Sequence, residues 1–146
     1  MGMFDAINIS ASALHAQRVR MDVIAQNIAN ANTTRTEDGT PYRRKIVVFE
    51  ERKQSFGDIL NEKLNASSNT YAGVRVKAII EDTSPFKKVY DPTHPDSDQN
   101  GYVNYPNVDI VTEMVNMIEA SRAYEANVTA MNITKSMITR IFEIGK

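Results

Sequence analysis

The stretch FDAINISASALHAQRVRMDVIAQNIANA, residues 4–31, decides the fold that this sequence predicts. It contains neither glycine nor proline, and its seam residues recur at alternating spacings of three and four, which is the heptad pattern of a packed helix. As one helix it would extend about 42 Å, at about 1.5 Å per residue. Three asparagines mark its end, because asparagine tolerates the left-handed conformation that terminates helices. The seam comprises Phe4, Ile7, Ala11, Leu14, Arg18, Met21, Ala25 and Ile28, and the asparagines are Asn27, Asn30 and Asn32.

The C-terminal segment repeats this pattern and adds a second apolar stripe. Pro106 precedes the segment, Asn107 or Asp109 can cap a helix there, and Gly145 can end it. The two stripes together are wider than one partner helix would cover, so the sequence predicts more than one neighbour. The seam is Ile110, Met114, Met117, Ser121, Tyr124, Val128, Met131, Lys135, Ile138 and Phe142. The second stripe is Val111, Val115, Ile118, Ile133, Met137, Ile141 and Ile144.

Between the two helical segments the apolar period changes to two, which indicates strands at residues 42–49 and 73–80. Residues 54–70 are less regular and predict a short helix in a mobile loop. The expected fold class is therefore α+β, with long terminal helices that pair in a coiled-coil-like α domain around a small β-rich middle region. The expected boundaries are 1–32 for the N-terminal helix, 33–107 for the middle region and 108–146 for the C-terminal helix.

The composition excludes several classes of protein. The 146 residues carry 17 basic and 18 acidic side chains, a net charge of -1, which offers no basic stripe for nucleic acid. We interpret the densest basic cluster, Arg43-Arg44-Lys45, as the solvated face of a strand. Cysteine is absent, which rules out disulfides and thiolate metal sites. No apolar run is long enough to span a bilayer, and the first seventeen residues lack the features of a cleaved signal, so export would need another route.

A polar loop, DSDQNGYVNYPN at residues 96–107, has acidic or amide residues at its first, third and fifth places and a glycine at its sixth, as a calcium loop does. Its twelfth place should be a glutamate that supplies two oxygens, and here Asn107 offers one neutral oxygen. Pro92 and Pro95 lie where the entering helix should run. We therefore interpret the loop as a polar turn followed by a short extended stretch at 101–105, with no metal site.

Catalytic residues are equally hard to assign. His15 has Ser12 and Asp5 on the same predicted helix, but a straight helix offers no oxyanion hole and no group that would orient the imidazole. Glu50 and Glu51 would point to opposite faces of a strand and could not act as an acid and base pair. The sequence predicts no enzyme, no cofactor and no small-molecule substrate. A loose metal site, interpreted instead as a solvated turn, would involve His94, Asp91, Asp96 and Asp98.

Both ends of the chain carry a recognisable pattern. RVRMDVIAQNIANANT, residues 18–33, resembles the N-terminal signature of the bacterial flagellar axial proteins, the family of rod, hook and hook-associated subunits. MVNMIEASRAYEAN, residues 114–127, resembles its C-terminal counterpart. Hook and distal-rod members usually follow the asparagine motif with a short Thr-x-Gly-Tyr turn, whereas this chain has RTEDGTPYRRK at residues 35–45. This departure argues against the hook branch, and together with SPFKKVYDPTHP at residues 84–95 and GYVNYPNV at residues 101–108 it resembles the proximal-rod branch. The resemblance covers nearly the whole chain outside residues 54–70.

This resemblance implies a structural subunit of the flagellar rod, which would assemble into a helical tube and transmit torque for motility. The implied partners are other rod proteins, copies of the same chain, the basal-body base with its MS ring and rod-base adaptor, and the flagellar type III export apparatus, without a cleaved signal. The alternative is a calcium-responsive or coiled-coil binding module. The residues expected to pack between subunits are Leu14, Met21, Asn27, Ile28, Asn30, Asn32, Met114, Met117, Tyr124, Val128, Met131 and Ile138.

Overall fold

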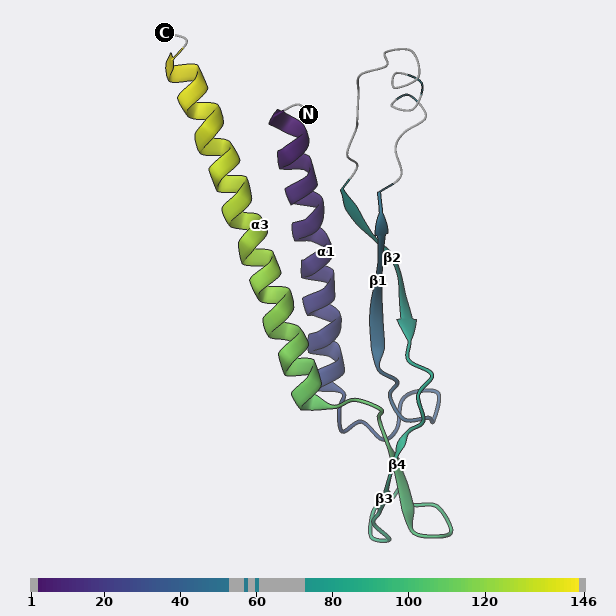
Figure 1. Ribbon diagram of the computed structural model, residues 1–146. Helices are drawn as coiled ribbons and strands as arrows, with labels where there is room; N and C mark the ends of the chain where they lie inside the picture. Colours follow the sequence, from purple (N-terminus) through teal and green to yellow (C-terminus); the bar gives the residue numbers. More distant parts are fainter. Residues whose placement is uncertain (1–2, 53–56, 58–59, 61–72, 145–146) are drawn as a thin grey trace. The chain divides into compact units, whose positions relative to one another are not determined.

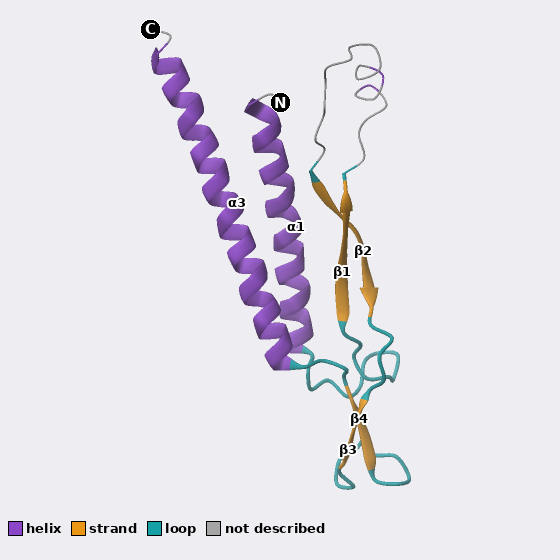
Figure 2. Cartoon of the chain, viewed as in Figure 1, coloured by secondary structure: helices purple, strands orange, loops and turns teal. Residues whose placement is uncertain are grey.

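A computed structural model describes residues 3–52, 57, 60 and 73–144, and along the chain one long helix precedes and one follows two short antiparallel hairpins (Figure 1). The chain divides into two compact units, and each helix contributes to both. Unit 1 comprises residues 1–19, 49–77 and 120–146, and unit 2 comprises residues 20–48 and 78–119. The coarse α+β expectation is confirmed, and Figure 2 shows the helices at the two ends of the chain with all strands between them. The three-part division at residues 32 and 107 stays a prediction.

Helix α1, Met3–Ala29, confirms the N-terminal helix. The reason that we gave for the end of this helix is wrong. Among the described residues only glycines have a positive φ, so no asparagine adopts the left-handed conformation. The chain turns instead through hydrogen bonds three residues apart, from the N–H of Ala31 to the carbonyl of Ile28 at 3.2 Å and from the N–H of Thr33 to the carbonyl of Asn30 at 3.0 Å, and the Asn30 side-chain amide donates to the carbonyl of Gln26 at 2.9 Å. The buried positions of the segment also differ from the heptad seam: they are Ser10, Ala16, Val23, Ile24, Asn27 and Ala31.

Helix α3, Ile110–Ile144, confirms the C-terminal helix and begins directly after Asp109. The carboxylate of Asp109 accepts from the backbone N–H of Val111 at 3.3 Å and the hydroxyl of Thr112 at 2.5 Å, so Asp109 is the N-cap. The inner positions of α3 keep the heptad spacing and include Met117, Tyr124, Met131 and Ile138 of the predicted seam, while Glu113, Ala120 and Asn127 each lie one residue before a seam position. The buried or half-buried inner positions include Glu113, Met117, Ala120, Tyr124, Asn127, Met131 and Ile138.

The strands form two separate two-stranded sheets (Figure 2). Strands β1, Lys45–Glu51, and β2, Val74–Glu81, confirm both predicted strands. Strand β3, Lys87–Tyr90, was not predicted, and it pairs antiparallel with β4, Tyr102–Tyr105, with Val89 opposite Val103. Val103 is buried, which anchors this hairpin in unit 2. The helix predicted within residues 54–70 lies outside the described residues, apart from the helical Gly57 and Leu60. Among the described helices, none has the length and apolar character of a membrane span.

Candidate functional site

A cluster of buried and half-buried polar side chains lies in unit 2, and we call Asn27, Tyr42, Arg44, Asn107 and Glu113 the polar cluster. Asn27 comes from the last turns of α1 and is 1% exposed. Its amide nitrogen donates to the carbonyl of Lys45 at 2.8 Å and to Oε2 of Glu113 at 2.9 Å. Its amide oxygen accepts from the hydroxyl of Tyr42 at 3.0 Å and from the backbone N–H of Lys45 at 2.9 Å. All four hydrogen-bonding positions of this amide are therefore used.

Glu113, in the first turn of α3, is a buried carboxylate, 1% exposed. Its Oε1 accepts from Nε and Nη2 of Arg44 at 2.9 and 2.7 Å, while Oε2 faces Asn27. Nη1 of Arg44 lies 3.6 Å from Oδ2 of Asp82, a second, partly exposed carboxylate. A carboxylate buried to this extent is tolerated only when it is paired and hydrogen-bonded, and Glu113 is both.

Asn107 extends the polar cluster to the chain that leads into α3. Its side-chain oxygen accepts from the backbone N–H of Arg44 at 2.9 Å, and its amide nitrogen donates to the carbonyls of Asp82 and Ser84 at 3.1 and 3.3 Å. Asn107 is therefore a bridge between chain segments, whereas Asp109 caps the helix. Within unit 2, the polar cluster joins the end of α1, the start of β1, the end of β2 and the start of α3.

The carboxylates of the loop at residues 96–107 are occupied by the loop and its neighbours. Oδ1 of Asp98 accepts from the backbone N–H of Asn100 and Tyr102, both at 2.9 Å, and Oδ2 of Asp96 accepts from the hydroxyl of Thr34 at 2.9 Å. Gly101 has a φ of 79°, which the turn into β4 requires. Nowhere in the described part of the chain do three or more His, Cys, Asp or Glu side chains gather in a way that could hold a metal ion.

Of the residues that we considered for catalysis, Ser12 and Glu50 have structural contacts. The hydroxyl of Ser12 donates to the carbonyl of Ile9 at 2.7 Å and accepts from the backbone N–H of Val74 at 3.1 Å, so it fastens the start of β2 to α1 in unit 1. His15 is exposed on α1. Glu50 forms ion pairs with Arg75 and Lys77 across the β1–β2 hairpin.

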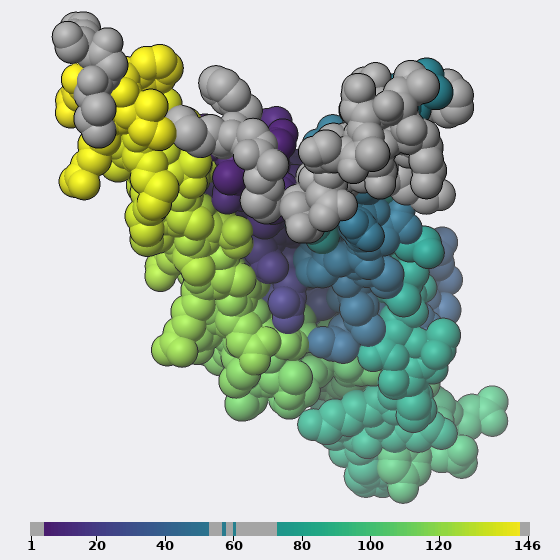
Figure 3. All heavy atoms as spheres, turned by 45° about the horizontal axis from the view of Figure 1, so that its top comes forward, coloured from purple at the N-terminus to yellow at the C-terminus, as the bar shows by residue number. Residues whose placement is uncertain are grey.

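The outward side of α3 exposes a row of large apolar side chains, which we call the outer stripe. In the space-filling view the C-terminal half of α3, in yellow, lies at the surface of the molecule (Figure 3). Val111 is 68% exposed, Ile118 54% and Met137 57%. The outer stripe consists of Val111, Val115 and Ile118 in unit 2, and Ile133, Met137 and Ile141 in unit 1.

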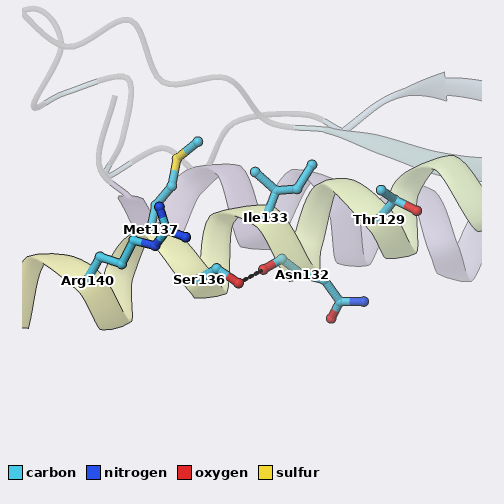
Figure 4. Close-up of a pocket in the computed structure, with 6 residues that line it drawn as sticks. All are labelled: Thr129, Asn132, Ile133, Ser136, Met137 and Arg140. Atoms are coloured by element: carbon cyan, nitrogen blue, oxygen red, sulfur yellow. Dashed lines mark hydrogen bonds between the residues drawn. The ribbon is translucent and has the colours of Figure 1, made fainter.

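A shallow hollow of about 400 Å³ lies on the outer stripe in unit 1. The described residues that line it all come from α3, and Figure 4 shows Ile133 and Met137 projecting to the same side of the helix. The hydroxyl of Ser136 is turned back onto the helix, where it donates to the carbonyl of Asn132 at 3.0 Å. An apolar hollow on a single helix is typical of a surface that a further element covers.

The residues expected to pack between subunits occupy several environments. Asn27 is buried in the polar cluster, so within one chain it already has its partners. Most of the others are half-buried, namely Leu14, Met21, Ile28, Asn30, Met117, Tyr124, Val128, Met131 and Ile138. Only Asn32 and Met114 are exposed. Their role between subunits stays a prediction.

Of the polar cluster, only Asn27 was among the predicted site residues, and the sequence reasoning missed Tyr42, Arg44, Asn107 and Glu113. Arg44 was assigned to a solvated strand face, and the structure instead pairs it with Glu113. The one available signal for Glu113 was its spacing: it lies four residues before Met117 and seven before Ala120, on the buried side of α3. A carboxylate on that side needs a cationic partner.

Two family models match the ends of the chain. Residues 7–35 match the model described as "Flagella basal body rod protein", and residues 99–144 match the model described as "Flagellar basal body rod FlgEFG protein C-terminal". These matches place the chain in the class of flagellar rod proteins and confirm the resemblance of both terminal motifs.

Full-length relatives identify the branch within this class. The chain is 51% identical over 150 residues to the flagellar basal-body rod protein FlgC of Bacillus subtilis (strain 168), with 100% of each chain covered. It is 50% identical over 144 residues to FlgC of Borreliella burgdorferi, covering 94% of this chain and 93% of that one, and 41% identical to FlgC of Salmonella typhimurium over all of both chains. The chain belongs to the family of FlgC flagellar basal-body rod proteins, which are structural subunits of the proximal rod. A calcium-responsive or coiled-coil binding module has no support.

Proposed function

We propose that the chain assembles with copies of itself and with other rod proteins into a helical tube, through α1 and α3, and transmits torque along the flagellar rod. The observation that carries this proposal is the outer stripe of α3, whose side chains have no cover in the described part of one chain. The outer stripe has an apolar group in each half of α3, Val111, Val115 and Ile118 before the stretch at 122–129 and Ile133, Met137 and Ile141 after it. Clusters of exposed large apolar side chains of this kind mark protein–protein contacts.

The proposed contact is head-to-tail. A surface on one subunit that meets a different surface on the next generates a ring or, when the rotation does not close, a helical tube. The terminal helices would pair in a coiled-coil-like manner within each subunit, and the outer stripe would meet neighbouring subunits. Helices interlocked at the packing density of a protein core deform little, which suits the transmission of torque. Of the residues assigned above to packing between subunits, nine are half-buried in one chain, from Leu14 to Ile138, and the proposed neighbours would cover them further.

The further partners follow from the family. We propose contacts with the basal-body base, meaning the MS ring and the rod-base adaptor, and passage through the flagellar type III export apparatus without a cleaved signal. Support for this export route comes from membership of the rod family and from the absence of cysteine, because no disulfide has to form or break around threading. The protein would act without catalysis, cofactor, small-molecule substrate or nucleic acid.

Replacement of an outer-stripe residue tests the assembly role. Met137→Asp places a carboxylate on the outer stripe, where the wild-type side chain is exposed in one chain and would be buried in the rod. The isolated variant should keep its helical circular dichroism, because an exposed aspartate costs the single chain little. Cells that carry only this variant should lack complete rods and hooks in electron micrographs of isolated basal bodies, and they should not swim.

The matched control is Thr139→Asp, which adds the same charge two residues along α3 at an exposed position whose hydroxyl bonds only to the carbonyl of Lys135. Two residues turn a helix by about 200°, so this charge lies on another side of α3. The control cells should swim. Complete basal bodies in Met137→Asp cells would refute assembly through the outer stripe.

A further inference from the structure

The buried contacts of unit 2 align the end of α1 with the start of α3 in one register. The side-chain amide of Asn27 donates to Glu113. Arg20, seven residues before Asn27 in α1, forms an ion pair at 3.7 Å with Glu119, which lies six residues after Glu113 in α3. Since the numbers fall along α1 as they rise along α3, the two helical segments run antiparallel. The Arg20–Glu119 pair is exposed, and pairs of this kind contribute little to stability. Any strong preference for this register must therefore come from the buried side chains.

The apolar contacts in unit 2 specify the register weakly. Within unit 2 the buried apolar residues of α1 are Val23 and Ile24, Ala31 lies just beyond the end of the helix, and on α3 the nearest inner apolar position is the half-buried Met117. Methionine adapts its shape to many surroundings, so contacts with Met117 select a register weakly. A slide of one helical turn, about 5.4 Å, would exchange one set of such contacts for a similar one.

The polar cluster responds differently to such a slide. A one-turn shift in either direction carries the Glu113 carboxylate away from both Arg44 and the Asn27 amide. Glu113 would stay on the inner side of α3 without Arg44 and the Asn27 amide, and a buried carboxylate without partners is strongly unfavourable. At the same time Asn27 would lose one of its four hydrogen bonds.

We propose that Asn27, Arg44 and Glu113 form a register lock, which selects one alignment of α1 and α3 in unit 2 among alignments that the apolar contacts alone would permit. Buried polar groups that fix register at a cost in stability are well attested in coiled coils. The register lock also fixes the position of the start of β1, because the Asn27 side chain is hydrogen-bonded to both the N–H and the carbonyl of Lys45, the first residue of that strand. This inference concerns the single chain and does not depend on how subunits assemble.

Distances between two spin labels on the full-length chain in solution test the register lock. The chain contains no cysteine, so Gln26→Cys and Glu119→Cys, both at exposed positions, give one label on each helix. These two sites lie at different heights along the antiparallel pair, so a slide changes their separation. The labelled chain with an intact polar cluster should give one narrow distance distribution.

The decisive variant replaces the lock with apolar residues: Asn27→Leu, Arg44→Met and Glu113→Leu together. It should stay helical by circular dichroism while its distance distribution broadens or splits by several ångströms, as a slide of one turn requires. An unchanged narrow distribution in the folded triple variant would overturn the proposal. The matched control is Met117→Leu, which alters packing but keeps the polar cluster, and it should keep the single distance. A broadened distribution in this control would also overturn the proposal, because packing would then set the register.

If the triple variant does not fold, Glu113→Gln decides. This substitution keeps the shape of the side chain and removes the charge that Arg44 and Asn27 hold. A second or broadened distance in Glu113→Gln supports the register lock. An unchanged distance, or loss of the fold in this variant too, overturns it, because the polar cluster would then supply stability without selecting an alignment.

Discussion

The hydroxyl of Tyr42 is a hydrogen-bond donor that its environment keeps protonated. The residue is buried, and its hydroxyl donates to Oδ1 of Asn27 at 3.0 Å. Burial raises the pKa of this hydroxyl above its ordinary value of 10.0, and the carboxylates of Glu113 and Glu81 raise the pKa further. A phenolate at this place would lose hydration and would meet negative charge, so the folded chain favours the protonated donor.

We predict that Tyr42→Phe lowers the free energy of unfolding by about 1 kcal/mol at neutral pH, since one neutral hydrogen bond is lost. A raised pKa in the folded state means that the contribution of the hydroxyl is complete below pH 10.0 and declines as the pH rises from there through the folded-state pKa. The stability difference between wild type and Tyr42→Phe should therefore shrink above about pH 10. Urea unfolding of both proteins from pH 7 to pH 11 measures it, and a difference that stays constant over this range would contradict the assignment.

Single residues of the polar cluster were predictable only in part. The sequence marks Asn27 as part of a motif at a helix end, yet its amide is committed to Tyr42, Lys45 and Glu113. Arg44 looks like any strand arginine, because its partner Glu113 lies sixty-nine positions away. Local pattern gives the side of a helix or strand on which a residue lies, whereas pairing between distant segments depends on the tertiary fold.

The connection between β2 and α1 in unit 1 depends on a glycine just before the strand. Gly73 has a φ of 77°, and a Cβ at this position would overlap Oγ of Ser12 and lie 3.5 Å from Cα of Ile9. Ser12 cannot retreat freely, because its hydroxyl bonds to both the carbonyl of Ile9 and the N–H of Val74. The close approach of helix and strand therefore needs a residue without a side chain.

We predict that Gly73→Ala destabilises the chain more than Gly39→Ala does. Gly39 has a similar φ of 74° but nothing within 4 Å of the added Cβ, so its substitution isolates the backbone strain, on the order of 1 kcal/mol. Gly73→Ala adds the displacement of Ser12 and loss of its hydrogen bond to Val74, at least about 1 kcal/mol more. Denaturant unfolding compares the two variants. Equal losses would mean that the contact between Gly73 and Ser12 contributes nothing.

Elements with long periodic patterns were predicted well, and of the two short strands β4 was predicted, as the extended stretch at 101–105, while β3 was not. Both helices, β1 and β2 follow from a sustained period of 3.6 or two. Strand β3 has four residues, KKVY, all exposed, so it has no apolar alternation and is a strand only because β4 pairs with it. The predicted end of α1 was correct, but the predicted cause was wrong. A side-chain hydrogen bond from asparagine and hydrogen-bonded turns end the helix, and no described residue there is left-handed.

The first turns of α3 are more buried than its last turns. In unit 2 its first turns are fastened by Glu113 and the Asp109 cap. Over residues 135–143, by contrast, Ile138 alone among the described side chains is not exposed. An isolated helical turn is marginally stable in water, because most of the stability of a helix in a protein comes from packing of one face. The structure therefore combines a well-fastened start of α3 with a C-terminal stretch that has few contacts of its own.

We predict that amide exchange in the dilute, purified chain is fast over residues 135–144 and slow over residues 23–29 and 113–124, since local opening is easiest where few apolar contacts are buried. In isolated basal bodies the same C-terminal stretch should exchange slowly, because the proposed neighbours cover the outer stripe and the end of α3. Exchange monitored by mass spectrometry on both samples makes the comparison. Strong protection of residues 135–144 in the dilute chain would mean that α3 needs no neighbour, and unchanged fast exchange in basal bodies would show that neighbours do not pack there. Protection that appears only in the basal body would place the ordering of this helix end at the moment of assembly, and would link the exposed apolar side chains of one subunit to the rigidity of the rod.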